Sequence, residues 1–165
     1  MALTGNVVAS TLAGFLADPN AGLGPAVSTL AADTGIAAAP IPPEHVVTQN
    51  VPVAISERAL AVKYPAVHVY VDRVQNLLFE KFRTFSGKVR TVAEIRVSQD
   101  RIEGIEDQVR LYVDAVTQVL DANRGSWGQG AFFTGGYQVI VEPVQQGGRN
   151  FLQIARVILE VDLSS

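Results

Sequence analysis

The chain contains no cysteine among its 165 residues. Disulfide bonds, zinc sites built on thiolates and a cysteine nucleophile are therefore excluded. Histidine is almost as scarce, since His45 and His68 are the only two, and neither has a serine or carboxylate at the spacing of a catalytic or metal motif. We therefore predict no enzyme activity, no cofactor and no metal site. His68 alternates with valines, so we expect it to point outward from a strand or into an interface.

Charged residues and long apolar runs are also few. Only 18% of the residues are charged and the net charge is −3, which argues against a general nucleic-acid binder, because such proteins neutralise phosphates with Lys and Arg. No run approaches the ~20 apolar residues that span a bilayer, and the N-terminus lacks the basic region of a signal peptide. We expect a soluble, unsecreted protein with no membrane partner, whose weakly charged surface favours contacts between subunits.

The first third of the chain is rich in alanine and proline. Apolar residues from Val7 to Leu16 fall near helical spacing, and Pro25 to Ala32 predicts a second short helix with proline in its first turn. Four prolines between Gly35 and Pro52 predict an extended connection. A further helical turn is expected at 56–63.

The strongest patterns lie after residue 64 and predict four strands. Residues alternate between apolar and polar from Val67 to Val71 and from Val89 to Val97. The same alternation from Tyr137 to Val144 and from Phe151 to Leu163, on either side of Gln145-Gln146-Gly147-Gly148, predicts a long antiparallel hairpin.

A helix of roughly 20 residues is expected between the two strand pairs. Asp100 precedes Glu103 by three residues, which is the spacing of a capping box, and Arg124-Gly125 supplies a basic last turn and a stop. The apolar stripe of this helix consists of Ile105, Val109, Tyr112, Val113, Val116, Val119 and Leu120.

These elements predict an α+β fold with a four-stranded, mainly antiparallel sheet packed against one long helix. Short N-terminal helices and the extended proline-rich segment precede it. We divide the chain into an N-terminal Ala/Pro-rich helical and extended arm, residues 1–52, and an α+β domain, residues 53–165.

Two features of the hairpin favour association. Pro143 cannot donate a ladder hydrogen bond, so its strand ends there or lies at a sheet edge. The run from Phe151 to Leu163 exceeds the usual 3 to 10 residues of a strand, so part of it is expected to overhang its partner. An open edge and an overhang both allow a sheet to continue into a neighbouring subunit. A bend or bulge within a monomer explains the same residues.

Aromatic residues supply the candidate contacts with subunits or partners. The glycine-rich segment 125–136 follows a helix and lacks lysine, so it is not a phosphate loop, and we expect a flexible connection. Its aromatic residues pack either on their own domain or on a partner. The basic residues near Phe82 allow single-strand nucleic-acid binding, but Glu80 interrupts them. The candidate interface residues are Phe79, Phe82, Phe85, Trp127, Phe132, Phe133 and Pro143.

Asp72 and Glu94 are the one candidate carboxylate pair for acid–base chemistry. Each is interpreted as a solvated charge on a strand face.

The C-terminal hundred residues resemble the tail-terminator and tail-completion proteins of tailed bacteriophages. The resemblance rests on a strand begun by Tyr64-Pro65, a second strand running from Ser86-Gly87 to Val97, and Ser98-Gln99-Asp100 before a long helix. The closing hairpin of 136–141 and 154–161 completes it. The N-terminal third matches less clearly.

The resemblance implies a non-enzymatic structural protein of the virion, assembled in the host cytoplasm. Such proteins form a ring, usually of six subunits, that caps the tail tube and offers a surface to the neck or head. The implied partners are further copies of the chain, the tail tube protein, a neck, connector or head-completion protein, and a sheath where the tail contracts. DNA would pass through the lumen without specific binding. The alternatives are a neck connector or head-tail adaptor and, in another class, a small ligand-binding or enzyme-accessory domain.

Overall fold

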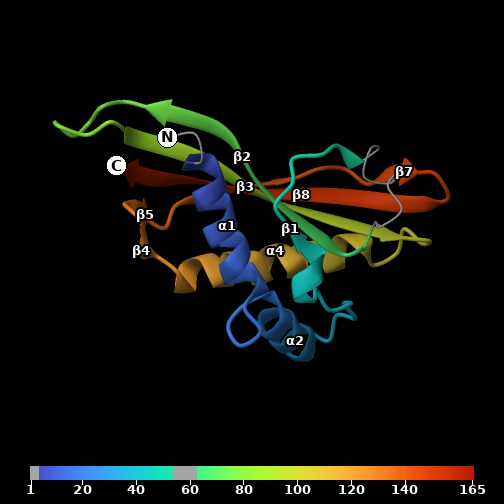
Figure 1. Ribbon diagram of the computed structural model, residues 1–165. Coiled ribbons are helices and arrows are strands. Elements are labelled where there is room, and N and C mark those ends of the chain that lie inside the picture. The colour runs from blue at the N-terminus through green and yellow to red at the C-terminus, as the bar shows by residue number, and fades with distance from the viewer. Residues whose placement is uncertain (1–3, 54–62) are drawn as a thin grey trace.

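The computed structural model describes residues 4–53 and 63–165 and shows an α+β fold with an eight-stranded sheet (Figure 1). Three α-helices lie within these residues, and the turn predicted at 56–63 falls almost entirely outside them. The helices are α1 (Thr4–Ala17), α2 (Leu23–Thr34) and α4 (Ile105–Ala122), with a short 3-10 helix at Pro43–His45. The strands are β1 (Val46–Val47), β2 (Ala66–Asn76), β3 (Ser86–Gln99), β4 (Gly125–Gly128), β5 (Ala131–Phe133), β6 (Tyr137–Val141), β7 (Gln145–Gly147) and β8 (Asn150–Ser164).

The prediction of a four-stranded sheet against a single helix is wrong. The sheet is mixed and curled, with the order β1-β2-β3-β8-β5-β4, and β6 and β7 also pair with β8. β1 is parallel to β2, whereas the other pairs are antiparallel. Four of the strands are only two to four residues long, too short to leave an alternating pattern in the sequence.

β8 is long enough to pair with four other strands. Its 15 residues pair on one edge with β3, from Phe151 to Ser164. On the other edge it pairs in succession with β7, β6 and β5. The predicted overhang is therefore absent, because the long β3 pairs with β8 along almost its whole length. The predicted hairpin is confirmed, although Pro143 separates β6 from β7 and the turn lies at 148–149.

Helix α4 carries the predicted apolar stripe, and every residue of that stripe is buried. The predicted capping box does not form, because the helix begins later, after Gly104 in a left-handed conformation. The side chain of Gln99 organises this start instead: its Nε2 donates to the carbonyl oxygens of Arg101 and Glu103, and its Oε1 accepts from Gln108 Nε2. The tertiary position of β3 thus sets where the helix begins.

All three helices lie on one side of the sheet (Figure 1). The two predicted N-terminal helices are confirmed as α1 and α2, and their buried side chains join α4 and the sheet in a single hydrophobic core. The proline-rich connection is fixed to the same core, since Ile41 is buried and Tyr112 Oη donates to the Ala39 carbonyl oxygen. Residues on both sides of the predicted boundary at 52/53 therefore share one core.

The glycine-rich segment 125–136 is not a loose connection but contains the β4–β5 hairpin. Trp127 packs edge-on against Phe15, and its ring also contacts Phe133, which is fully buried. At Gly130 the backbone has φ of 81°, and a Cβ there would lie 2.0 Å from the Ser164 carbonyl oxygen. Glycine is required at this position because the two backbones approach so closely.

Candidate functional site

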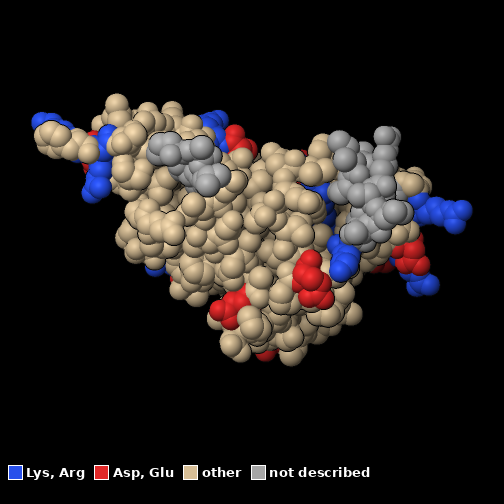
Figure 2. All heavy atoms as spheres, viewed as in Figure 1, with Lys and Arg blue, Asp and Glu red and all other residues tan. Residues whose placement is uncertain are grey.

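A long arm formed by the β2–β3 connection protrudes from the body of the protein, with Lys and Arg side chains near its tip (Figures 1 and 2). Its base is ordered by Asn76, whose Oδ1 accepts from the backbone N–H groups of Ser86 and Leu78 and whose Nδ2 donates to the Thr84 carbonyl oxygen. Phe82 at the tip is fully exposed and has a positive φ of 63°. The other exposed apolar residues of the arm are Val74, Leu77, Leu78 and Phe79. An ordered arm with exposed apolar side chains is typical of a contact surface.

A second exposed apolar surface is β6. Cross-strand partners share a face of the sheet, so Tyr137, Val139 and Val141 lie on the helix side and Ile140 on the other side. All four side chains are more than a third exposed. β6 pairs only with β8 among the described residues, and its outer edge is therefore open. An open edge with apolar side chains on both faces favours association with another strand.

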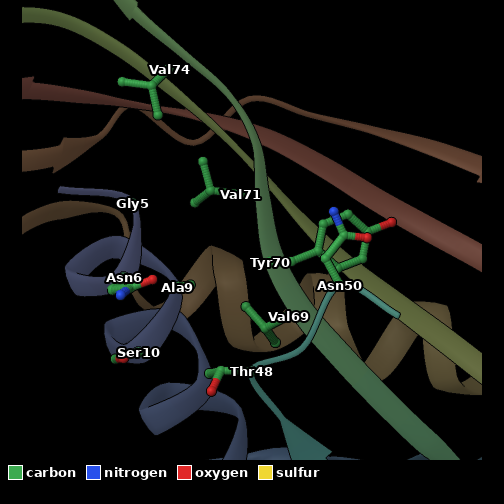
Figure 3. Close-up of a pocket in the computed structure, with 10 residues that line it drawn as sticks. All are labelled: Gly5, Asn6, Ala9, Ser10, Thr48, Asn50, Val69, Tyr70, Val71 and Val74. Carbon is green, nitrogen blue, oxygen red and sulfur yellow. The ribbon is translucent and has the colours of Figure 1, made fainter. Parts of the chain in front are cut away.

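The third feature is a groove of about 760 Å³ between α1 and the outer edge of β2 (Figure 3). One wall comes from α1, the other from β2 and the segment after β1. The residues that line it are Gly5, Asn6, Ala9, Ser10, Thr48, Asn50, Val69, Tyr70, Val71 and Val74. None of them is charged, and the polar groups are amides and hydroxyls. The groove therefore suits an uncharged occupant that can form hydrogen bonds.

The sheet face opposite the helices holds a buried network of charges. Glu94 is at its centre: Oε2 lies 2.6 Å from Arg96 Nη2 and Oε1 accepts from Arg156 Nε at 2.9 Å. Tyr70 Oη donates to the same Oε1 at 3.0 Å. Arg156 also pairs with Glu142, and Arg96 donates to the Val51 carbonyl oxygen. Among the described residues, the network joins two carboxylates to two guanidinium groups.

These contacts decide how the groups of the network titrate. Burial alone raises the pKa of the Glu94 carboxyl, but Arg96, Tyr70 and Arg156 outweigh it and hold that pKa below its usual value. Burial and the Glu94 carboxylate raise the pKa of Tyr70. The Glu94 carboxyl is thus held in its ionised form by its partners, which is typical of a structural ion pair rather than of a general acid.

The predicted candidate residues are distributed over several environments. Phe79, Phe82, Phe132 and Pro143 are exposed, with the first two on the arm and the last beyond the end of β6. Phe85 and Phe133 are buried in the core and offer no contact surface, and Trp127 is partly buried against the core. Six of these residues are aromatic, and aromatic type alone does not distinguish a core position from an exposed tip. The seven residues do not form one site.

The strand register and the burial of the side chains overturn the predictions made for the Asp72–Glu94 pair and for His68. Glu94 is opposite His68, not Asp72, and it is buried in the network rather than solvated. Asp72 pairs instead with Arg90. His68 is buried and does not point into solvent. It lies beside Glu94 and Arg96 on the sheet face opposite the helices. The alternation of Glu94 and Arg96 along one strand is the signal that, together with Arg156, marked this network in the sequence.

The buried His68 predicts a loss of stability in acid. Its Nδ1 has no hydrogen-bond partner among the residues that the structure describes, and burial followed by the charge of Arg96 lowers its pKa from 6.5 to about 4. In the unfolded chain His68 therefore binds a proton near pH 6.5, whereas in the folded chain it binds one only near pH 4. The free energy of unfolding should be constant above pH 7 and fall by about 2 kcal/mol between pH 7.5 and pH 5.

Urea unfolding at these two pH values, followed by circular dichroism, measures this effect. His68→Gln removes the titrating group and should flatten the pH dependence in this range. An equally steep loss in the variant would assign the acid sensitivity to other groups.

In the part of the chain that the structure describes, no cluster of three His, Asp or Glu side chains is arranged to hold a metal ion. No helix there is long and apolar enough to cross a membrane. Comparison of the chain with models of known protein families and with curated protein sequences finds no match.

Proposed function

We propose that this chain is a structural protein that joins copies of itself into a ring, and that the ring terminates the tail tube of a bacteriophage and connects the tail to the neck or head. The exposed apolar edge strand β6 is the observation that carries the proposed self-assembly. The place in the phage tail is supported by the resemblance of the C-terminal hundred residues to tail-terminator proteins. In a soluble monomer, charged side chains or a covering segment normally prevent an exposed edge strand from pairing with another chain. Here the strand carries no charge and is open, which favours a permanent interface.

The arrangement of the sheet favours a ring over a symmetric dimer. β6 lies on one side of the long strand β8, and β2 lies on the other side beyond β3. In the described part of the chain β2 also has an open stretch of outer edge, since β1 pairs with it only at Val67 and His68. Two different open edges at opposite ends of one sheet permit head-to-tail contacts, which close into rings when the rotation allows.

The arm supplies the proposed contact with the tail tube or neck. Phe79 and Phe82 are exposed at its tip, beside Lys81 and Arg83. In a ring, several arms would project together and bind one layer of tube subunits. Docking of the ring on the last tube layer would hide the surface that recruits the next subunit, and growth would stop. The weakly negative chain would let DNA pass without tight binding.

Light scattering coupled to size exclusion, over a concentration series, tests the assembly. We expect a species near six times the 17.6 kDa of the chain. A compact monomer at every concentration, with no ring on isolated tail tubes, would contradict the proposal.

The arm variant Phe79→Ser/Phe82→Ser should keep the ring mass but lose binding to tail tubes in a sedimentation assay. Ile102→Ser is the control, because Ile102 is also an exposed apolar residue, at 51%, and lies away from the arm. A ring that binds the connector or head protein and leaves tube polymerisation unchanged would favour a neck connector.

A further inference from the structure

The outer edge of β2 is an unoccupied position for one more strand. Its other edge pairs with β3 on both sides of an irregularity between Val71 and Arg73. Among the described residues, the outer edge is paired only at Val67 and His68, with β1. From Val69 to Asn76 no described strand pairs with this edge. The backbone groups there can accept an added strand, which is the mode of recognition called β-augmentation.

The groove beside this edge gives such a strand a defined place. It is bounded by α1 on one side and by Thr48 and Asn50 at its end, next to β1 (Figure 3). The wall from α1 consists of small residues: a Cβ on Gly5 would be in van der Waals contact with Val71 at 3.5 Å, and Ala9 and Ser10 follow one turn later. The groove of about 760 Å³ between this helix and β2 is the space that an extended segment can enter.

We propose that β6 of a second copy of this chain binds in this groove as an additional strand, antiparallel to β2, so that copies join head to tail through one continuous sheet. The inference rests on the proposed self-assembly and names its two surfaces. The direction follows from the order of the sheet: β6 is antiparallel to β8, β8 to β3, and β3 to β2. If the strands keep this alternation around the ring, β6 is antiparallel to the β2 it meets.

The side chains of the two surfaces match in character. On β6, Tyr137, Val139 and Val141 share the helix side of the sheet. In a continuous sheet they would point to the side on which Val69 and Val71 of the next copy face α1. Five residues of β6 fit within the eight-residue stretch from Val69 to Asn76.

Charge also selects β6 as the occupant. No residue from Tyr137 to Val141 is charged, and no residue that lines the groove is charged. The arm is the other exposed apolar segment, but its tip would bring Glu80, Lys81 and Arg83 toward an uncharged groove, where their desolvation is unfavourable. β6 buries its apolar side chains without this cost.

Two variants, each blocking one surface, test the proposal. Val139→Lys/Val141→Lys places charges on the edge of β6, and Asn6→Arg/Ser10→Arg fills the groove from exposed positions of α1. The matched controls are Ile102→Lys and Thr29→Arg, which are exposed and outside both surfaces. Each blocked variant alone should have the monomer mass of 17.6 kDa, and each control should keep the wild-type mass.

Mixing the two blocked variants is the decisive measurement. The first retains an intact groove and the second an intact β6, so an equimolar mixture should form a dimer of one copy of each and nothing larger. A mixture that stays monomeric, or blocked variants that keep the wild-type ring, would overturn the pairing of β6 with β2 while leaving ring formation standing. A wild-type protein that is monomeric throughout would instead overturn the proposed function. A variant whose thermal unfolding is lowered is replaced by its single form, Val141→Lys or Asn6→Arg.

Discussion

Replacing Glu94 with glutamine should lower the free energy of unfolding by about 3 to 5 kcal/mol. Glu94 is 4% exposed and contacts Arg96, Arg156 and Tyr70 together. Glutamine has the same shape but no charge, so Arg96 and Arg156 would lose the carboxylate that both contact. The cost arises because the charge of Glu94 is removed from a buried site beside two guanidinium groups, whose desolvation remains.

An exposed ion pair from the same sheet provides the control. Glu160 lies 3.4 Å from Lys88, and about half of its side chain is exposed. Glu160→Gln should cost less than about 1 kcal/mol, since solvent screens such pairs. Urea unfolding of both variants at pH 7.5 gives the comparison, and that pH avoids the titration of His68. Similar small losses in the two variants would show that the network contributes no more than surface charges do.

Replacing Val157 with aspartate should prevent folding. Val157 is 0% exposed, lies on the helix side of the central strand β8 and belongs to the main core. An aspartate there has no cation within the core to pair with. Burying it costs several kcal/mol, which is comparable to the total stability of about 5 to 15 kcal/mol of a typical domain. Circular dichroism and the yield of soluble protein measure the outcome.

Val139 is the matched control for Val157, because the two valines are direct cross-strand partners on the same face. Val139 is 38% exposed, since β6 lies beyond the cover of α4. Val139→Asp should fold with nearly wild-type stability and should lose ring formation. If both variants fold, the helix side of β8 is not the core; if both unfold, β6 is not an open edge in solution.

The sequence was sufficient for the elements with a long, regular pattern. The stripe of α4 repeats over five turns, and the alternation in β2, β3 and β8 extends over many residues, so local geometry alone predicts these elements. The helix start was misplaced because the capping box at Asp100 is a local signal, whereas Gln99, held on β3, bonds the preceding loop and Gln108. The short strands β1, β4, β5 and β7 were missed because each depends on pairing with a distant strand.

Local patterns in the sequence are enough to predict an α+β protein without cysteine chemistry, with an apolar, weakly charged chain and a strand interrupted at Pro143. They do not show which aromatic residues are exposed: Phe82 and Phe85 are three residues apart, yet one is at the tip of the arm and the other in the core. The tertiary fold also leaves β2 and β6, among the described strands, with open edges on opposite sides of β8, and it places α1 beside one of them. These properties depend on which strands are neighbours, and strand neighbours are set by long-range pairing that no local pattern encodes.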